Sequence, residues 1–181
     1  VGSALLDQIV VMRGVTSPDK ILEQLHLGVK KALQQEQTIN DDGMDASVCV
    51  IDEKNKQLLF AGAKNSLVYI KDNQIHEAKA DRQSIGGKRE ATKPFTKHII
   101  PLGDTPIMAY LFSDGYQDQF GGLNGRKLMK KNFKKLLYDI HHLSMQEQYD
   151  HLSKHLYEWI NDHSINQKQI DDILVVGVKL L

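Results

Sequence analysis

Apolar residues recur at two different spacings along this chain, and the change of spacing separates predicted helices from predicted strands. In the first forty or so residues the spacing is helical. One helix carries Leu5, Leu6, Ile9 and Val10, and a second helix begins after the cap Thr16-Ser17-Pro18 and ends near Gln37. From Ala46 onward the apolar runs are short and strand-like. The pattern therefore predicts two helices followed by strands.

Short apolar runs bounded by polar links predict seven strands. They cover Ala46–Ile51, Gln57–Ala63, Leu67–Lys71, Gln74–Ala78, Phe95–Pro101, Ile107–Ser113 and Ile173–Leu180. Short links favour antiparallel pairing, so the first four predict a meander in which Asp72-Asn73 forms a hairpin turn. The last strand is apolar at nearly every position, which predicts a central place in its sheet.

Two more helices are predicted between the last two strands. One covers about Lys127–His142, and the other begins at Ser144, where Glu147 three residues later completes a capping box, and runs to about Asp162. Helices, then strands, then helices and a last strand predict an α+β fold. The 181 residues contain no composition shift that marks a boundary, so one domain over residues 1–181 is predicted.

The composition of the chain argues against several classes of function. The net charge is zero, with 23 basic and 23 acidic residues and no basic stripe interleaved with aromatic residues, so no nucleic-acid partner is expected. The single cysteine, Cys49, lies in an apolar run, which favours a buried, inert thiol in a reducing, cytoplasmic compartment. The longest apolar stretches have about seven residues against the ~20 that span a bilayer, so this segment is predicted to make no membrane contact.

Acidic residues stand at the borders of two predicted strands. Asp114-Gly115 follows Ile107–Ser113, and Asp171-Asp172 precedes Ile173–Leu180. Antiparallel pairing of these strands would bring the acids together, and oxygen-only ligands suit Mg²⁺ or Mn²⁺ better than zinc. The alternatives are a simple turn at Asp114 and an exposed connector at Asp171-Asp172. A third acidic segment, Asp41-Asp42-Gly43-Met44-Asp45, is a weaker candidate because acids before a strand are usually solvated.

Two further patterns have ordinary structural interpretations. His151 and His155 have a spacing that can bind zinc, but no glutamate accompanies them as in zinc proteases, so a solvated helix surface is predicted. The segment Ser84-Ile85-Gly86-Gly87-Lys88 is glycine-rich but lacks the spacing of a phosphate-binding loop. A plain loop is the preferred interpretation.

Five short motifs occur along the chain in this order: Gly43–Ser47, Ala61–Asn65, Ser84–Gly87, Leu111–Gly122 and Asp171–Val176. Together, and in the same order, they resemble the motifs of SpoIIE-type protein phosphatases, which belong to the metal-dependent PP2C-like superfamily of serine/threonine phosphatases. The resemblance covers nearly the whole chain. It implies a PP2C-like α-β-β-α sandwich of two antiparallel sheets flanked by helices.

The resemblance also implies site residues and a reaction. Asp114 and Asp171 match the metal-ligating aspartates of the C-terminal motifs, Asp172 stands where relatives carry Asp or Asn, and Asp42 is a candidate for a third, weaker metal position. In such enzymes a water held between two Mn²⁺ or Mg²⁺ ions attacks a phosphoserine or phosphothreonine. The implied partner is a phosphoprotein in a bacterial signalling pathway.

The chain also departs from the family pattern. Relatives carry an N-terminal strand pair with a Gly-Asp-x-x-Gly-His-Gly type motif, whose aspartate bridges the metals, and no such motif is present here. This suggests a C-terminal fragment that binds metal weakly and turns over slowly, with a sensor or regulatory domain, and any membrane anchor, upstream in the parent protein. Uncovered strand edges would favour a homo-oligomer. The alternative function is a non-catalytic module of the same fold that binds a partner or dimerises.

Overall fold

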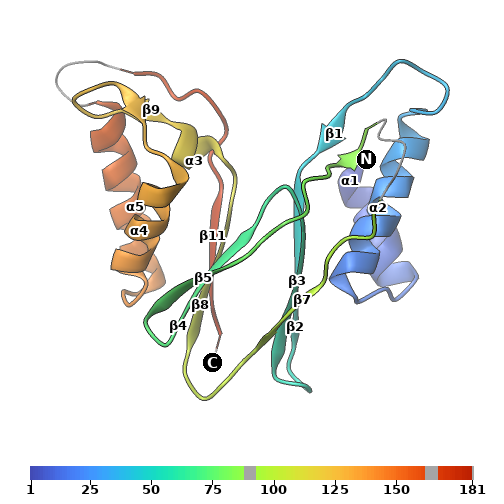
Figure 1. The fold of residues 1–181 in the computed structure, drawn as a ribbon, viewed down its shortest axis with the longest axis horizontal. Helices are drawn as coiled ribbons and strands as arrows, with labels where there is room; N and C mark the ends of the chain where they lie inside the picture. The colour runs from blue at the N-terminus through green and yellow to red at the C-terminus, as the bar shows by residue number, and fades with distance from the viewer. Residues whose placement is uncertain (88–92, 162–166, 181) are drawn as a thin grey trace. The chain divides into compact units, whose positions relative to one another are not determined.

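The computed structural model describes residues 1–87, 93–161 and 167–180, and these divide into two compact units (Figure 1). The first unit holds Val1–Leu67 and Glu77–Pro106, and the second unit holds Val68–His76 and Ile107–Leu180. Helices and antiparallel sheets occur in both, as the sequence pattern predicts. Over the described segments, no helix is long and apolar enough to cross a lipid bilayer.

Two helical segments open the first unit. The first comprises α1 (Gly2–Leu6) and a π-helical continuation, η1 (Asp7–Met12), and the second is α2 (Pro18–Ala32). α2 stops before the predicted end near Gln37, because Gln34 adopts a positive φ of 49° that a helix cannot continue through. Its buried face carries apolar residues at helical spacing: Ile21, Leu22, Leu25 and Val29.

The sheet of the first unit packs against α2. It has the antiparallel order β2-β3-β7, with β2 at Ala46–Asp52, β3 at Gln57–Ala63 and β7 at His98–Pro101. Ala61 and Ala63 of β3 are fully buried and share a core cluster with α2. A two-residue pairing of β1 (Gly43–Met44) with β6 (Ile85–Gly86) completes this unit.

The chain changes sheets between β3 and β4 (Leu67–Lys71), so the predicted four-stranded meander is wrong. At Lys64 the backbone has a φ of 63°, and the N–H of Lys64 donates to the carbonyl of Asp81 at 2.8 Å. The end of β3 therefore lies against the Asp81 segment, where Ala63 forms a parallel bridge. β4 pairs with β8 instead. Strand periodicity predicts that each strand exists but not which strand lies beside it.

The sheet of the second unit has the order β11-β8-β4-β5. β8 covers Ile107–Phe112, β11 covers Val175–Leu180 and β5 covers Gln74–Ala78. The predicted hairpin turn between β4 and β5 is confirmed, since Asp72 and Asn73 have the positive φ angles of a type I′ turn, 50° and 56°.

Three helices complete the second unit: α3 (Gly115–Asp118), α4 (Lys130–Ile140) and α5 (Met145–Ile160). A small ribbon of β9 (Phe120–Gly121) and β10 (Arg126–Lys127) precedes α4. The capping box predicted for α5 is confirmed, because Ser144 accepts from the N–H of Glu147 and the Glu147 carboxylate accepts from the N–H of Ser144. The predicted end of α5 at Asp162 lies outside the described residues. The helices and sheet enclose a core of Tyr110, Tyr116, Leu128, Phe133 and Leu137.

β11 lies at the edge of its sheet, and the prediction of a central strand is therefore wrong for the described part of the chain. Most of its residues are exposed, and Val176 and Val178 expose 41% and 38% of their surfaces. The apolar composition of β11 predicts that both of its faces are covered by other residues. It does not predict whether those residues belong to this chain. β2 likewise occupies an edge of the first unit's sheet.

We expect the chain to self-associate through the free edge of β11. An apolar edge strand with unpaired backbone N–H and C=O groups recruits another strand. Light scattering over a concentration series should show a rising mean mass for the wild type. Val178→Lys should lower this mass, because a lysine on an edge strand opposes pairing, whereas Leu123→Lys, at a loop residue that is 73% exposed, should leave it unchanged. A wild type that stays monomeric at high concentration would refute the prediction.

Candidate active site

The register between β8 and β11 places the predicted acids at one end of the second unit's sheet. Val175 pairs with Phe112, so Asp114 lies just beyond the end of β8, and Asp171-Asp172 lie just before the start of β11. This confirms the antiparallel pairing predicted from the sequence. All three aspartates are exposed.

Ser113 fixes the backbone between the two acidic segments. Its hydroxyl donates to the carbonyl of Asp172 and accepts from the N–H of Leu174, each at 2.9 Å. The N–H of Ser113 also donates to the carbonyl of Leu174 at 3.0 Å. These three hydrogen bonds extend the pairing of β8 and β11 beyond the Phe112–Val175 pair. The role of Ser113 is not evident from the sequence, where the one signal is its place directly before the candidate ligand Asp114.

Gly115 allows the same backbone to approach α3 closely. A Cβ atom at this position would lie 2.4 Å from the carbonyl oxygen of Asp172, which is far inside van der Waals contact. The carbonyl group of Asp172 therefore occupies the space that the missing side chain of Gly115 leaves.

Gly115→Ala should therefore destabilise the second unit by about 1–3 kcal/mol, as overpacking against a backbone group does. The change in the free energy of unfolding can be measured by urea denaturation. Gly2→Ala is the matched control, because a Cβ there meets only the Met44 side chain at 3.6 Å, an ordinary contact. Equal stabilities of the two variants would contradict the close approach.

The acidic side chains differ in their local bonds. The Asp171 carboxylate accepts from the N–H of Asp172 at 2.7 Å, and the Asp171 carbonyl accepts from the side chain of Gln169. Asp114 is the N-cap residue of α3, yet its carboxylate makes no capping hydrogen bond. A carboxylate that does not cap its own helix is available to bind a ligand.

Aspartate carboxylates are a suitable type of ligand for a hard cation, but too few ligands gather here, among the described residues, to hold one. Carboxylate oxygens are the usual ligands of Mg²⁺ and Mn²⁺. Within the ranges that the structure describes, however, no three His, Cys, Asp or Glu side chains gather closely enough to hold a metal ion. A cation site at Asp114 and Asp171 stays a prediction, and such a site would need further ligands.

Asp42, the candidate for a third metal position, belongs to the first unit. Its side chain is exposed, its N–H donates to Asn40 Oδ1 and its carbonyl accepts from Gln35 Nε2 at 2.6 Å. Both of these bonds use the backbone of Asp42 and fix the loop before β1. A metal role for its carboxylate stays a prediction.

The glycine-rich segment Ser84–Gly87 is held by side chains of the first unit. The N–H of Gly86 donates to His26 Nδ1 at 3.0 Å, and the N–H of Gly87 donates to Gln35 Oε1 at 2.9 Å. Both glycines have positive φ, 78° and 82°. Because these two N–H groups are already bonded, they are not available to a phosphate, which supports the plain-loop interpretation. Lys88 lies outside the described residues.

Two other sequence predictions concern single side chains. Burial raises the pKa of the Cys49 thiol to about 11, which agrees with an inert thiol. The prediction of a solvated surface is wrong for His155: its Nδ1 lies 3.2 Å from the hydroxyl of Tyr116, and burial lowers its pKa. His151 is exposed as predicted.

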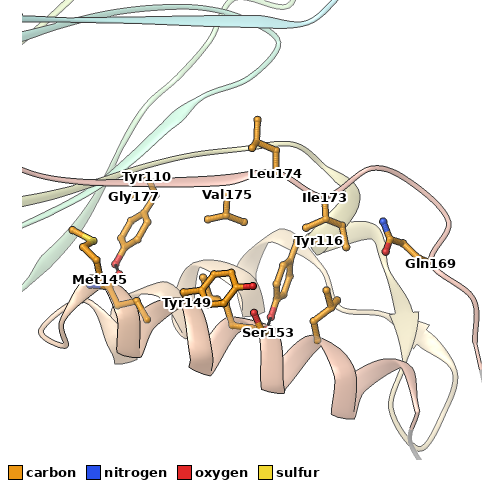
Figure 2. A pocket seen from close by; sticks show the side chains of 13 residues that line it. Tyr110, Tyr116, Met145, Tyr149, Ser153, Gln169, Ile173, Leu174, Val175 and Gly177 are labelled. Atoms are coloured by element: carbon orange, nitrogen blue, oxygen red, sulfur yellow. Dashed lines mark hydrogen bonds between the residues drawn. The ribbon is translucent and has the colours of Figure 1, made fainter.

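A cavity of about 470 Å³ lies between α5 and the β8–β11 pair (Figure 2), and its lining includes Gln169 and Ile173, which stand on either side of Asp171-Asp172 in the sequence. Tyr110 and Tyr116 point from the sheet side toward α5, where Tyr110 donates to Gln148 Oε1 and Tyr116 donates to the carbonyl of Leu152, each at 2.8 Å. The described residues that line this cavity include no charged side chain. The cavity therefore offers no charged group to bind a phosphoryl group or a cation, and the aspartates at the end of the sheet stay the candidate site.

Comparison with known proteins decides the family. The family model described as Stage II sporulation protein E (SpoIIE) matches residues 4–181. The chain belongs to the SpoIIE family. The resemblance inferred from the sequence motifs is thereby confirmed, and with it membership of a group of metal-dependent serine/threonine phosphatases.

Solved structures agree with the SpoIIE assignment. The SiaA-PP2C domain of Pseudomonas aeruginosa matches with a TM-score of 0.83 and 28% identity over 99% of this chain and 67% of that chain. The phosphatase domain of SpoIIE from Bacillus subtilis matches with a TM-score of 0.57 and 15% identity, over 99% and 73% respectively. The photosystem II phosphatase PBCP matches with a TM-score of 0.54 and 14% identity, over 89% and 58%. No curated protein matches the chain. The PP2C-like fold class is confirmed.

Proposed function

We propose that this SpoIIE-family chain hydrolyses phosphoserine or phosphothreonine in a protein of a bacterial signalling pathway, with Mn²⁺ or Mg²⁺ as the cofactor. The observation that carries the proposal is the joining of the two acidic segments by Ser113, which holds Asp114 and Asp171-Asp172 at one end of the sheet. The family and the similar phosphatase domains support the reaction class. A phosphatase domain of SpoIIE from Bacillus subtilis has also been described after presoaking with Mn.

The chain's own residues have separate roles in this proposal. Asp114 and Asp171 hold a cation with their carboxylates, Asp172 contributes to the negative charge of the site, and Ser113 keeps the two segments in place. When bound, the cation favours ionisation of a water molecule and neutralises charge that develops on the transferring phosphoryl group. Asp42 is the candidate for a further, weaker cation position.

Calorimetric titration with Mn²⁺ tests the shared site. Asp114→Asn should weaken binding by at least about tenfold, because the amide removes one of the negative charges that attract the cation. Asp104→Asn, an exposed aspartate of the first unit, is the matched control and should bind as the wild type does. Equal affinities of Asp114→Asn and the wild type would count against a site shared by Asp114 and Asp171.

The absence of a three-residue metal group in the described part of the chain favours one alternative, a non-catalytic module that binds a phosphoprotein or dimerises. The two functions differ in a simple assay. An enzyme releases phosphate from p-nitrophenyl phosphate when Mn²⁺ is added, whereas a binding module does not.

A further inference from the structure

The backbone that carries Asp171 belongs to no helix or strand. Residues 167–174, which include Gln169 in Figure 2, have no regular secondary structure, so no ladder of backbone hydrogen bonds fixes them before β11 begins. Ser113 holds the part of this segment that follows Asp171. The part that precedes Asp171 is held in a different way.

The side chain of Gln119 attaches the part that precedes Asp171. Gln119 follows α3 and is fully buried. Its amide nitrogen donates to the carbonyl of Lys168 at 3.0 Å, and its amide oxygen accepts from the N–H of Ile170 at 3.3 Å. The nitrogen donates a second time, to the carbonyl of Phe120 at 3.0 Å. Both amide protons and the amide oxygen are thus bonded, as is usual for a buried amide.

The backbone of Gln119 is itself fixed by two neighbouring elements. Its carbonyl accepts from the indole N–H of Trp159 at 3.0 Å and from the N–H of Leu128 at 3.1 Å. Trp159 belongs to α5, and Leu128 lies between β10 and α4. Gln119 therefore joins the end of α3 to α5 and to the segment before Asp171, and a shift of its backbone would break these bonds.

Gln119 lies in the same short stretch of chain as Asp114. Asp114 is the N-cap residue of α3 and Gln119 is its C-cap residue, so one short helix separates them. Ile170, which Gln119 holds, directly precedes Asp171, and adjacent Cα atoms are only about 3.8 Å apart. The bonds of Gln119 and Ser113 thus flank both acids along the chain. Together they set the separation of the Asp114 and Asp171 backbones.

We propose that Gln119 is a positioning residue for the candidate site, because its side-chain amide holds Asp171 at the distance from Asp114 that a shared cation requires. The inference rests on the proposed function, in which these two carboxylates hold Mn²⁺ or Mg²⁺. Such cations accept oxygen ligands within a narrow range of distances, so a small displacement of one ligand weakens binding. Loss of a hydrogen bond that orients the ligands typically lowers metal affinity by about 10- to 100-fold.

Hydrogen exchange of the metal-free, full-length protein tests the attachment itself. Gln119→Met keeps the length of the side chain and removes its hydrogen bonds, so the amides of residues 168–172 should exchange about tenfold faster than in the wild type. Gln148→Met is the matched control. Gln148 is also buried and bonds to the hydroxyl of Tyr110 and the carbonyl of Leu143, and in the described part of the chain its hydrogen bonds do not reach residues 168–172.

Calorimetric titration with Mn²⁺ separates positioning from stability. Both variants should unfold at lower urea concentrations than the wild type, since each removes the bonds of a buried amide. Gln119→Met should raise the Kd for Mn²⁺ by about tenfold or more, whereas Gln148→Met should bind Mn²⁺ as the wild type does. In p-nitrophenyl phosphate hydrolysis, Gln119→Met should need more Mn²⁺ and recover kcat at saturation. Equal Kd values in the two variants, or unchanged exchange of residues 168–172 in Gln119→Met, would overturn the proposal.

A second variant decides the question if Gln119→Met does not fold. Gln119→Asn retains the amide on a side chain that is one methylene shorter, so it cannot reach Lys168 and Ile170 as Gln119 does. A wild-type Kd for Mn²⁺ in Gln119→Asn would overturn the proposal. Weaker Mn²⁺ binding by this variant, with no phosphate release by the wild type, would support the positioning role and reject the phosphatase activity. Phosphate release by the wild type, with an unchanged Kd in the variant, would reject the positioning role and support the activity.

Discussion

Replacement of Asp114 or Asp171 by asparagine is expected to lower Mn²⁺-dependent phosphate release by about a hundredfold or more in the full-length protein. Asparagine keeps the shape of the side chain and removes its negative charge, so the cation is held less tightly. Charge stabilisation by a bound cation contributes several kcal/mol to such reactions, and each 1.36 kcal/mol corresponds to about tenfold in rate. The rate of p-nitrophenyl phosphate hydrolysis over a range of Mn²⁺ concentrations measures the effect.

A control variant and circular-dichroism melting curves separate a loss of cation binding from a loss of folding. Asp104→Asn should retain wild-type activity, because Asp104 is exposed and belongs to the first unit. Asp114→Asn and Asp171→Asn should melt near the wild-type temperature, since neither carboxylate is buried. Recovery of activity at high Mn²⁺ would locate the defect in cation binding. Wild-type rates in both variants would reject these aspartates as site residues.

Phe133→Ala is expected to destabilise the second unit by about 3–5 kcal/mol, the usual cost of removing a large aromatic side chain from a core. Phe133 is fully buried. Its ring stacks on Tyr116 with centroids 4.3 Å apart and meets Phe112 edge-on at 4.9 Å. These contacts join α4 to α3 and β8, on either side of Asp114. The cavity left by alanine would therefore loosen the backbone that positions this acid.

Fluorescence of the chain's single tryptophan, Trp159, can follow this unfolding in urea, because Trp159 packs against the same core cluster. Phe120→Ala is the matched control: Phe120 is 36% exposed, and its loss should cost clearly less. The Phe133 variant should also bind Mn²⁺ more weakly. A Phe133→Ala protein as stable as the Phe120→Ala protein would show that this aromatic cluster does not hold the second unit together.

Local chemistry in the sequence determined most of the elements and the family. Ser144 and Glu147 define the start of α5 because a capping box involves only residues three apart. Asp72-Asn73 predicts a hairpin because these residue types tolerate positive φ. The ordered motifs around Asp114 and Asp171 identified the SpoIIE family, since each motif is a short stretch of adjacent residues.

The tertiary structure alone decided which strands are neighbours and what surrounds the site. The apolar composition of β11 indicates buried faces but not an edge position, because periodicity carries no information about the partner that covers a face. The Ser113 hydroxyl, the Asp172 carbonyl against Gly115 and the contact of His155 with Tyr116 all join residues separated by about forty to sixty positions. Such contacts depend on the path of the whole chain, whereas helix caps and turns depend only on adjacent residues.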